Sequence, residues 1–422
     1  MFRLLLRPRR SVRLLCLLGC VGAAAAAELA PARPFPQHTT YAAGAIRPDH
    51  VSQATLDAAT RDFYARWKQT YLLPAAAPGQ TYVLDDEDNR QGNGASTSEG
   101  HGYGMLIAAF MAGADPQAQE LFDGLWRFAR AHPSKFNPRL MGWRQEDAGA
   151  KTRSDGEDAA TDGDLDIALA LLLAEAQWGR AGTIDYRREA QQVIAAIKQD
   201  EINRECWSVK LGDWATPDDD KFNSTRASDF MPGHFRCFAA ASGDRDWLKV
   251  NETCYRLIAA MQTEFSPATG LIPDFIIEVN RSPAPPPGKH LEGKHDGHYY
   301  YNSCRVPLRL GIDFLIHGEP RAKVALEKIN TWLEAATGGQ AARVCAGYSL
   351  EGKPTSKSDR SLAFTACFGV GAMTDAAHQP WLNALWDETV QSDSADDRYF
   401  GRTLKMLSLI AMSGNWWSPL GK

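Results

Sequence analysis

The stretch ATDGDLDIALALLLAEAQW, residues 160–178, decides the fold. Three aspartates alternate with small or apolar residues at its start, and an apolar run then continues to Trp178. The pattern predicts a helix over 163–178 with Asp162 as its start signal. Helix capping would need only one acid, so it does not explain all three aspartates. A calcium-binding loop does not explain them either, because its closing Glu and its Gly are absent. Asp162 is therefore a candidate substrate-facing carboxylate.

Helical periodicity extends outward from this stretch in both directions, whereas the alternation typical of strands is scarce. Many helices are joined by short turns such as 113–116 and 318–320, and longer segments rich in Gly, Pro, Asn and aromatics lie between the pairs. This alternation predicts an all-α fold of six hairpins in a ring, with function carried by the long loops on one face. Twelve helices are expected, some with start signals such as Ser52 and Ser358, over 52–72, 100–113, 116–131, 163–178, 184–200, 228–242, 244–263, 304–317, 320–336, 358–374, 378–390 and 396–413.

The N-terminus is typical of an export signal. Five arginines precede a short apolar run and an alanine run, so residues 1–27 are expected to be a signal peptide followed by one catalytic domain over 28–422. A retained membrane anchor and a lipoprotein attached through Cys20 are the alternatives. We expect a secreted or periplasmic protein with no membrane span after cleavage, because no other stretch is long and apolar enough.

Charge and cysteine content restrict the partners. The full chain has a net charge of −5, and loss of the five arginines lowers it to about −10, which argues against a nucleic-acid partner. Six cysteines remain after cleavage, and either disulfides or buried free thiols are compatible with that number. No cysteine or histidine pattern has zinc-ligand spacing, so neither a metal nor a cofactor is expected.

A second chemical segment is SEGHGYGM, residues 98–105, in which a polar loop gives way to a helix beginning near Gly100. Glu99 on that rim would serve as a general acid if burial raised its pKa. The alternative is a carboxylate that is favoured only by the positive end of the helix dipole.

The third segment, residues 291–307, mixes acids, histidines and three tyrosines directly before a helix. Aromatic faces and polar groups in this mixture are typical of sugar recognition. Metal binding by His290, His295 and His298 is a weaker alternative, because no matching ligand pattern occurs elsewhere.

These three motifs, in this order, resemble glycoside hydrolase family 8. The resemblance spans roughly residues 90–410 and rests on SEGHGYGM, on the 160–178 stretch and on YNSCRVPLR at 301–309. It implies an (α/α)6 barrel, which agrees with the twelve helices counted independently.

The resemblance also implies roles for individual residues. Glu99 matches the family's proton donor, and Asp162 matches the aspartate that contacts the sugar at the cleavage point and helps to place the water. Many members have an aspartate base where this chain has Asn302, and an amide cannot accept the proton. In members with asparagine the base is a glutamate on the preceding loop, for which Glu292 is the best match. Asp296 and Glu278 are the reserve candidates.

Further residues are expected to bind the sugar chain. By family resemblance and loop position, Trp143 is the first stacking platform, and Tyr300 and Trp214 follow. Arg305 is expected to brace an active-site carboxylate, with a structural role at the helix start as the alternative. Trp416 and Trp417, close to the C-terminus, are expected to serve packing.

The combined expectation is an inverting endo-hydrolase of β-1,4 linkages in cellulose or mixed-linkage β-glucan, acting as a monomer. A chitosanase of the same fold is the close alternative, because the acidic run 85–88 could bind ammonium groups. An alternative of another class is a non-catalytic polysaccharide-binding accessory protein.

Overall fold

The computed structural model describes residues 30–85, 96–153, 155–180, 182–392 and 398–420. Twelve α-helices are the dominant secondary structure of this described part of the chain. They are α1 (Gln53–Tyr71), α2 (Ser98–Met111), α3 (Ala118–Ala131), α4 (Thr161–Trp178), α5 (Tyr186–Asp200), α6 (Pro232–Ser242), α7 (Trp247–Ala260), α8 (Val306–His317), α9 (Pro320–Thr337), α10 (Leu362–Ala372), α11 (Gln379–Gln391) and α12 (Tyr399–Met412).

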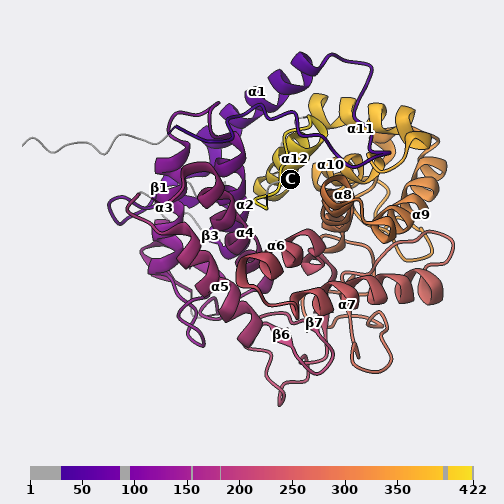
Figure 1. Cartoon of the computed structure of the whole chain (residues 1–422). Helices are drawn as coiled ribbons and strands as arrows, with labels where there is room; N and C mark the ends of the chain where they lie inside the picture. The colour runs from indigo at the N-terminus through magenta and orange to yellow at the C-terminus, as the bar shows by residue number, and fades with distance from the viewer. Residues whose placement is uncertain (1–29, 86–95, 154, 181, 393–397, 421–422) are drawn as a thin grey trace, which may run out of the picture.

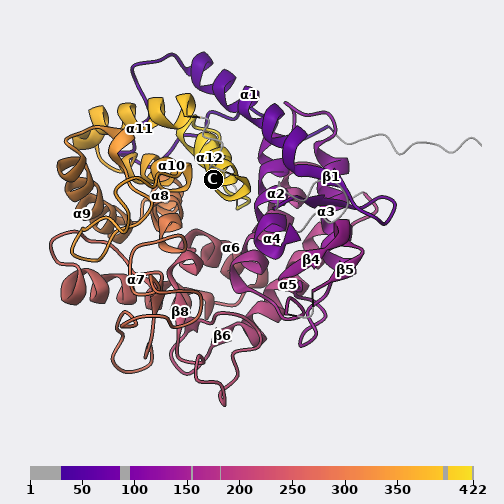
Figure 2. The same ribbon diagram turned by 180° about the vertical axis from the view of Figure 1, so that it is seen from behind.

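The helices form two concentric rings, which Figures 1 and 2 view from opposite ends. The even-numbered helices α2, α4, α6, α8, α10 and α12 pack in sequence order, and α12 returns to α2 to close the inner ring. Each odd-numbered helix packs outside an inner one, and α1 joins α12 to complete the sixth pair. The predicted (α/α)6 barrel of six hairpins is confirmed.

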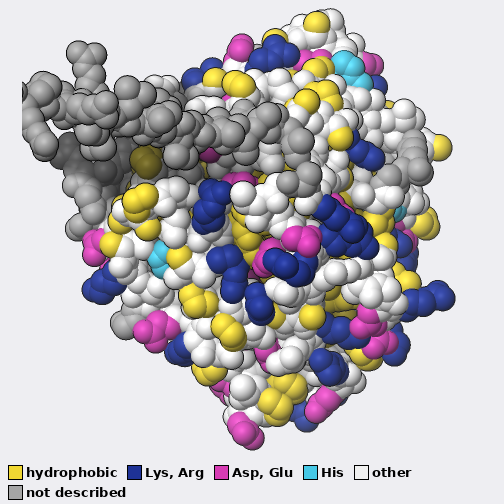
Figure 3. Space-filling model, turned by 60° about the vertical axis from the view of Figure 1, so that its left-hand side comes forward, with side chains coloured by type: hydrophobic (Ala, Val, Ile, Leu, Met, Phe, Trp, Pro, Cys, Tyr) yellow, Lys and Arg dark blue, Asp and Glu magenta, His cyan; other side chains and the backbone are white. Residues whose placement is uncertain are grey.

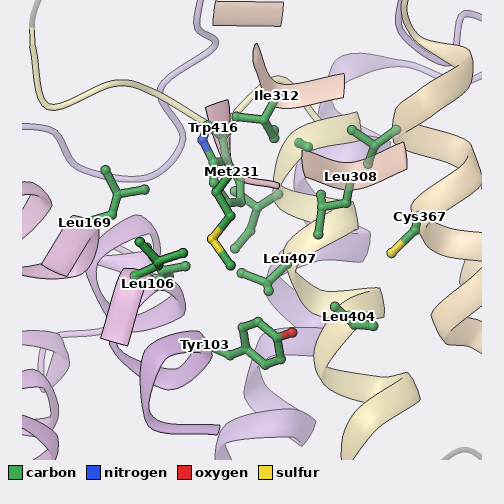
Figure 4. Close-up of a cluster of buried hydrophobic side chains, with 14 of the residues drawn as sticks. Tyr103, Leu106, Leu169, Met231, Leu308, Ile312, Cys367, Leu404, Leu407 and Trp416 are labelled. Carbon is green, nitrogen blue, oxygen red and sulfur yellow. The ribbon is translucent and has the colours of Figure 1, made fainter. Parts of the chain in front are cut away.

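Burial distinguishes the two rings. Every described side chain of α10 is buried, as are nearly all of those in α2 and α4, whereas α1 and α5 bury only one face. Apolar side chains from the inner helices meet in the middle of the ring (Figure 4), including those of Leu106, Leu169, Leu308 and Leu407. The barrel centre is thus a packed core, and a ligand can bind only at one end of it.

Helices α2 and α4 approach each other closely because both carry glycine at the contact. A Cβ atom on Gly102 would lie 2.6 Å from the Cβ of Asp166, and one on Gly163 would lie 2.5 Å from the backbone carbon of Ser98. Such distances leave no room for a side chain. The glycines thereby place the first turns of the two helices, with Glu99 and Asp162, side by side.

Connections differ between the two ends of the barrel, as predicted. Short turns such as 113–117, 243–246 and 318–319 follow the inner helices α2, α6 and α8. Long loops precede inner helices and carry short antiparallel strands: β1 (Leu72–Pro74) with β2 (Thr81–Val83), β3 (Ser96–Thr97) with β4 (Arg144–Glu146) and β5 (Lys151–Thr152), β6 (Ile202–Asn203) with β7 (Ser208–Val209), and β8 (Thr225–Arg226) with β9 (Phe275–Ile276). The amino-terminal ends of the inner helices therefore lie on the long-loop face.

Several helix starts differ from the predictions. Ser52 caps α1 as expected, but the cap of α10 is Ser361 rather than Ser358. Helix α4 begins at Thr161, so Asp162 lies inside the first turn instead of capping it. Helix α2 begins at Ser98 after the Thr97 cap, which likewise places Glu99 within the first turn. Both acids point from helical turns, not from flexible loops.

The remaining sequence predictions concern cysteines, terminal tryptophans and the leader. The six cysteines from Cys206 to Cys367 are free thiols, so the disulfide alternative is wrong for them. Trp416 and Trp417 are buried against Phe110, which confirms their packing role. In the part of the chain that the structure describes, no helix has the length and apolarity needed to span a membrane. The predicted signal peptide, residues 1–27, lies outside the described residues.

Candidate active site

A groove of about 660 Å³ opens on the long-loop face of the barrel. Its walls come from the first turns of inner helices and from the loops that precede them. Its lining residues are Thr97, Ser98, Glu99, Trp143, Asp155, Asp158, Ala159, Ala160, Asp162, Leu211, Trp214, Arg226, Leu291, Glu292, Tyr301, Asn302, Arg305 and Phe400. Six of the seven predicted site residues are in this set.

Glu99 projects from the first turn of α2 with its side chain 20% exposed. Its Oε2 accepts a hydrogen bond from Arg305 Nη1 at 2.6 Å, and its Oε1 accepts one from the Tyr399 hydroxyl at 3.1 Å. Burial raises its pKa to about 7 despite the neighbouring Arg305 guanidinium, and the Asp162 carboxylate adds to the rise. A carboxyl with this pKa is partly protonated near neutral pH, as a general acid must be.

Arg305 links two of the acids from beneath the groove. Its side chain is only 3% exposed, and Nη1 lies 2.6 Å from Glu99 Oε2 and 2.8 Å from Asp162 Oδ2. The same nitrogen donates to the Tyr103 hydroxyl at 3.0 Å. Arg305 thus contacts two carboxylates of the groove, the geometry that its predicted bracing role requires, and it compensates charge that burial would otherwise destabilise.

The three aspartates of the 160–178 stretch each have different partners. Asp162 binds Arg305, and Asp164 Oδ1 accepts the backbone N–H of Met141 at 3.0 Å. Asp166 accepts from Arg309 Nη1 and pairs with His234, both at 2.8 Å. Tertiary pairing, rather than the helix dipole alone, accounts for three acids in two helical turns.

Glu292 enters the groove from the loop before α8. Asn302 Nδ2 donates to its Oε2 at 2.8 Å, and Arg226 Nη2 lies 3.1 Å from its Oε1. Asn302 Oδ1 in turn accepts from Arg305 Nη2 at 2.8 Å. An amide suits this position because it accepts from the guanidinium on one side and donates to the carboxylate on the other, which an aspartate could not do.

The loop that carries Glu292 is held by Asp296, whose side chain is buried. Its Oδ2 accepts the backbone N–H groups of His290, Leu291 and Glu292 at 2.8, 2.7 and 3.0 Å, and its Oδ1 accepts that of Gly293 at 2.8 Å. With four donors converging on it, this carboxylate is unavailable as a base. It fixes the backbone from which Glu292 projects.

Glu278, the other reserve candidate, is also not a groove residue. Its Oε2 accepts from Arg281 Nε at 2.5 Å, and its side chain is 43% exposed. Of the three carboxylates considered for the base, only Glu292 lines the groove with Glu99 and Asp162.

Four aromatic side chains line the groove: Trp143, Trp214, Tyr301 and Phe400. The Trp143 indole N–H donates to the Asp155 carbonyl at 2.7 Å, which fixes the orientation of its ring. Tyr300 is not among the lining residues, because its ring packs against His295 with the centroids 4.7 Å apart. The structure therefore corrects the prediction by one residue, and Tyr301, 37% exposed, lies at the groove instead.

The weaker alternatives from the sequence gain no geometric support. His295 and His298 face each other through their Nδ1 atoms at 2.9 Å, while His290 Nε2 lies 3.0 Å from Ser224 Oγ. Among the described residues, no group of three or more acids, histidines or cysteines could hold a metal ion. Within the acidic run 85–88, Asp85 pairs with Arg144 at 2.7 Å, and residues 86–88 lie outside the described residues.

Sequence reasoning missed three residues around the acids. Arg226 reaches Glu292 from β8, and Tyr399 reaches Glu99 from α12. Asp274, buried beside β9, accepts the backbone N–H groups of Tyr300 and Ser303 at 2.8 Å and so orders the start of the 301–309 motif. None of these lies in a motif that carries its own chemical pattern, and only the tertiary fold brings them to the site.

Surface charge is mixed on the face drawn in Figure 3, where Lys and Arg side chains lie beside Asp and Glu.

Comparisons with known proteins identify the family. The model of the family "Glycosyl hydrolases family 8" matches residues 34–414. A β-glucanase of Niallia circulans is 43% identical over 409 residues, covering 97% of each chain, and an endoglucanase of Bacillus sp. (strain KSM-330) is 40% identical over 395 residues, covering 92% of this chain and 82% of its own. The apo structure of a β-1,3-1,4-glucanase from Paenibacillus sp. X4 superposes with a TM-score of 0.87 at 43% identity, covering 92% of this chain and 100% of that one. The chain belongs to glycosyl hydrolase family 8.

Proposed function

We propose that the protein is an exported endo-hydrolase that cleaves β-1,4 linkages of mixed-linkage β-glucan or cellulose with inversion. The observation that carries the proposal is the groove that holds Glu99 and Glu292 in contrasting environments. The names of the β-glucanase and endoglucanase relatives support the substrate class. Four aromatic side chains in the groove suit stacking on the apolar faces of glucose rings.

In the proposed reaction Glu99 gives its proton to the glycosidic oxygen as the bond from that oxygen to the anomeric carbon breaks. A water attacks the anomeric carbon from the opposite face, and Glu292 accepts the proton that this water releases. Asp162 is placed to contact the sugar at the cleavage point. One water is consumed, and solvent returns both carboxyls to their starting protonation states.

The environments of the two carboxyls support this division of roles. Arg226 forms an ion pair with Glu292 and Asn302 donates a hydrogen bond to it, so a cation and an amide N–H both face the carboxylate proposed as the base. Glu99 is the more buried of the two, with 20% of its side chain exposed against 48% for Glu292, and burial favours the protonated form.

A substrate panel tests the proposal. Purified protein should release new reducing ends from lichenan and carboxymethylcellulose, with little release from chitosan. The names of the β-glucanase and endoglucanase relatives favour a glucan over chitosan. Faster cleavage of chitosan would make the chitosanase alternative correct. Binding to all three polymers without new reducing ends would identify an accessory protein instead.

A further inference from the structure

The two oxygens of the Glu99 carboxyl have chemically different partners. Oε2 faces the Nη1 of Arg305 at 2.6 Å, whereas Oε1 faces the hydroxyl of Tyr399 at 3.1 Å. A guanidinium has only donors, whereas a phenol hydroxyl can both donate and accept. A proton on Oε2 would compete with the Arg305 N–H for the same short contact. The proton that Glu99 transfers therefore belongs on Oε1.

We propose that Tyr399 is a positioning residue that keeps the transferable proton on Oε1 of Glu99. The inference rests on the proposed role of Glu99 as the general acid. Tyr399 acts through Glu99, since Phe400, rather than Tyr399 itself, is the α12 residue that lines the groove.

The place of the Tyr399 hydroxyl is set by packing on both sides. Its side chain is buried, and its ring meets that of Tyr71 edge to face with centroids 6.2 Å apart. On the other side, a Cβ atom on Gly100 would lie 3.0 Å from the hydroxyl oxygen. The glycine that follows Glu99 thus leaves the space that the tyrosine hydroxyl occupies next to Oε1.

The hydrogen bond between Oε1 and the phenol can run in either direction. While Glu99 is protonated, Oε1–H donates to the Tyr399 oxygen until the glycosidic oxygen of a bound substrate takes its place. As the glycosidic bond breaks, the proton moves from Oε1 to the leaving oxygen, and Tyr399 turns its own O–H toward the new carboxylate. Tyr399 keeps its proton throughout, so the step balances.

The Tyr399 hydroxyl stabilises the ionised form of Glu99 more than the protonated form, because hydrogen bonds to a charged acceptor are roughly twice as strong as neutral ones. The charged groups facing Glu99 are Arg305 from the turn directly before α8, Asp162 from α4 and Arg226 from β8. A Tyr399→Phe exchange leaves all three unchanged and removes only the hydroxyl group. The ionised form then loses a donor, so Glu99 should hold its proton to higher pH.

The test is the pH profile of kcat/KM for Tyr399→Phe on lichenan. We expect kcat to fall on the order of tenfold, the scale of one lost hydrogen bond to a charged group, with KM little changed. The basic limb of the profile should move to higher pH. Tyr41→Phe is the matched control, because Tyr41 donates to the Ala411 carbonyl at 2.8 Å and does not line the groove. It should lower the melting temperature and leave the profile in place.

Two results would overturn parts of this scheme, and they can be told apart. A Tyr399→Phe profile that coincides with the wild type, in a protein that melts normally, would exclude the positioning role while Glu99→Gln remains inactive. Full activity of Glu99→Gln would instead remove the proposed function on which the inference depends. If Tyr399→Phe were too unstable for a full profile, following the titration of Glu99 by ¹³C NMR at low temperature would give the same answer.

Discussion

Each side of the groove carries a glutamate, Glu99 on one side and Glu292 on the other, and the two are held in different ways. Glu99 stands on the first turn of an inner helix, packed between α4, α8 and α12, and its side chain is 20% exposed. Glu292 stands on an irregular loop, and its side chain is 48% exposed. Glu99 is held by the barrel itself, whereas Glu292 is held by its contacts with Asn302 and Arg226.

This difference shows how one fold surrounds two glutamates with different environments. On the helix side, burial raises the pKa of Glu99 to about 7 even though Arg305 donates to it. On the loop side, solvent and two donors surround Glu292. The two sides meet through Arg305 and Asn302 and also through Arg226, which lies 3.1 Å from Glu292 Oε1 and 4.0 Å from Asp162 Oδ1.

The largest expected effect comes from removing either carboxylate. Glu99→Gln and Glu292→Gln should each lower kcat by at least about a hundredfold, the scale of general acid–base catalysis. Both variants keep the shape of the side chain, so their melting temperatures serve as the folding control. Retained activity in Glu292→Gln would mean that another group is the base.

A substitution that loosens the loop carrying Glu292 should lower kcat less than removal of the Glu292 carboxylate does. Asp296→Asn replaces one acceptor oxygen of a carboxylate that receives four backbone N–H groups, so we expect kcat to fall about tenfold or more because Glu292 is misplaced. Initial rates on lichenan measure the effect. The double variant with Glu292→Gln should be no slower than Glu292→Gln alone, and additive losses would show that Asp296 does not act through Glu292.

Raising the pH tests the acid side without a substitution. Glu99 must be protonated to act, and its raised pKa of about 7 means that this form is lost as the pH rises through that value. The kcat/KM of the wild type should therefore fall about tenfold per pH unit above neutrality. A rate that stays constant to pH 9 would contradict a titrating acid.

The smallest effect is expected from substituting one of the four aromatic side chains that line the groove, because they take no part in the proposed proton transfers. Trp143→Ala removes a ring contact of about 1 kcal/mol, which corresponds to roughly a fivefold rise in KM. Its kcat should change little, because the ring binds the sugar before and during reaction alike. Tyr300→Phe offers a comparison, since the Tyr300 ring packs on His295 away from the groove and KM should remain unchanged.

Much of the acid side could be predicted from the sequence. Helical periodicity and the two acid-bearing motifs are local signals, and they located Glu99, Asp162 and the inner helices to within a few residues. Helix starts shifted because caps depend on local side-chain contacts, as with Ser361 in place of Ser358.

The base side was harder to predict because loops have no periodic signal. Glu292 came from resemblance and not from pattern, and the roles of Asp296 and Asn302 depend on contacts that only the folded loop creates. In a row of three tyrosines, sequence cannot tell which ring faces the groove, and the predicted Tyr300 gave way to Tyr301. Arg226 and Tyr399 were missed because each reaches the acids from a separate part of the chain.

The most direct measurement is the anomeric form of the first product. ¹H NMR during hydrolysis of a mixed-linkage β-glucan should show new reducing ends appearing first as the α anomer, with the β anomer following by mutarotation. This is the result expected when Glu292 activates a water on the face opposite the leaving group that Glu99 protonates. New reducing ends that appear first as the β anomer would contradict the assignment of Glu99 as acid and Glu292 as base in an inverting reaction.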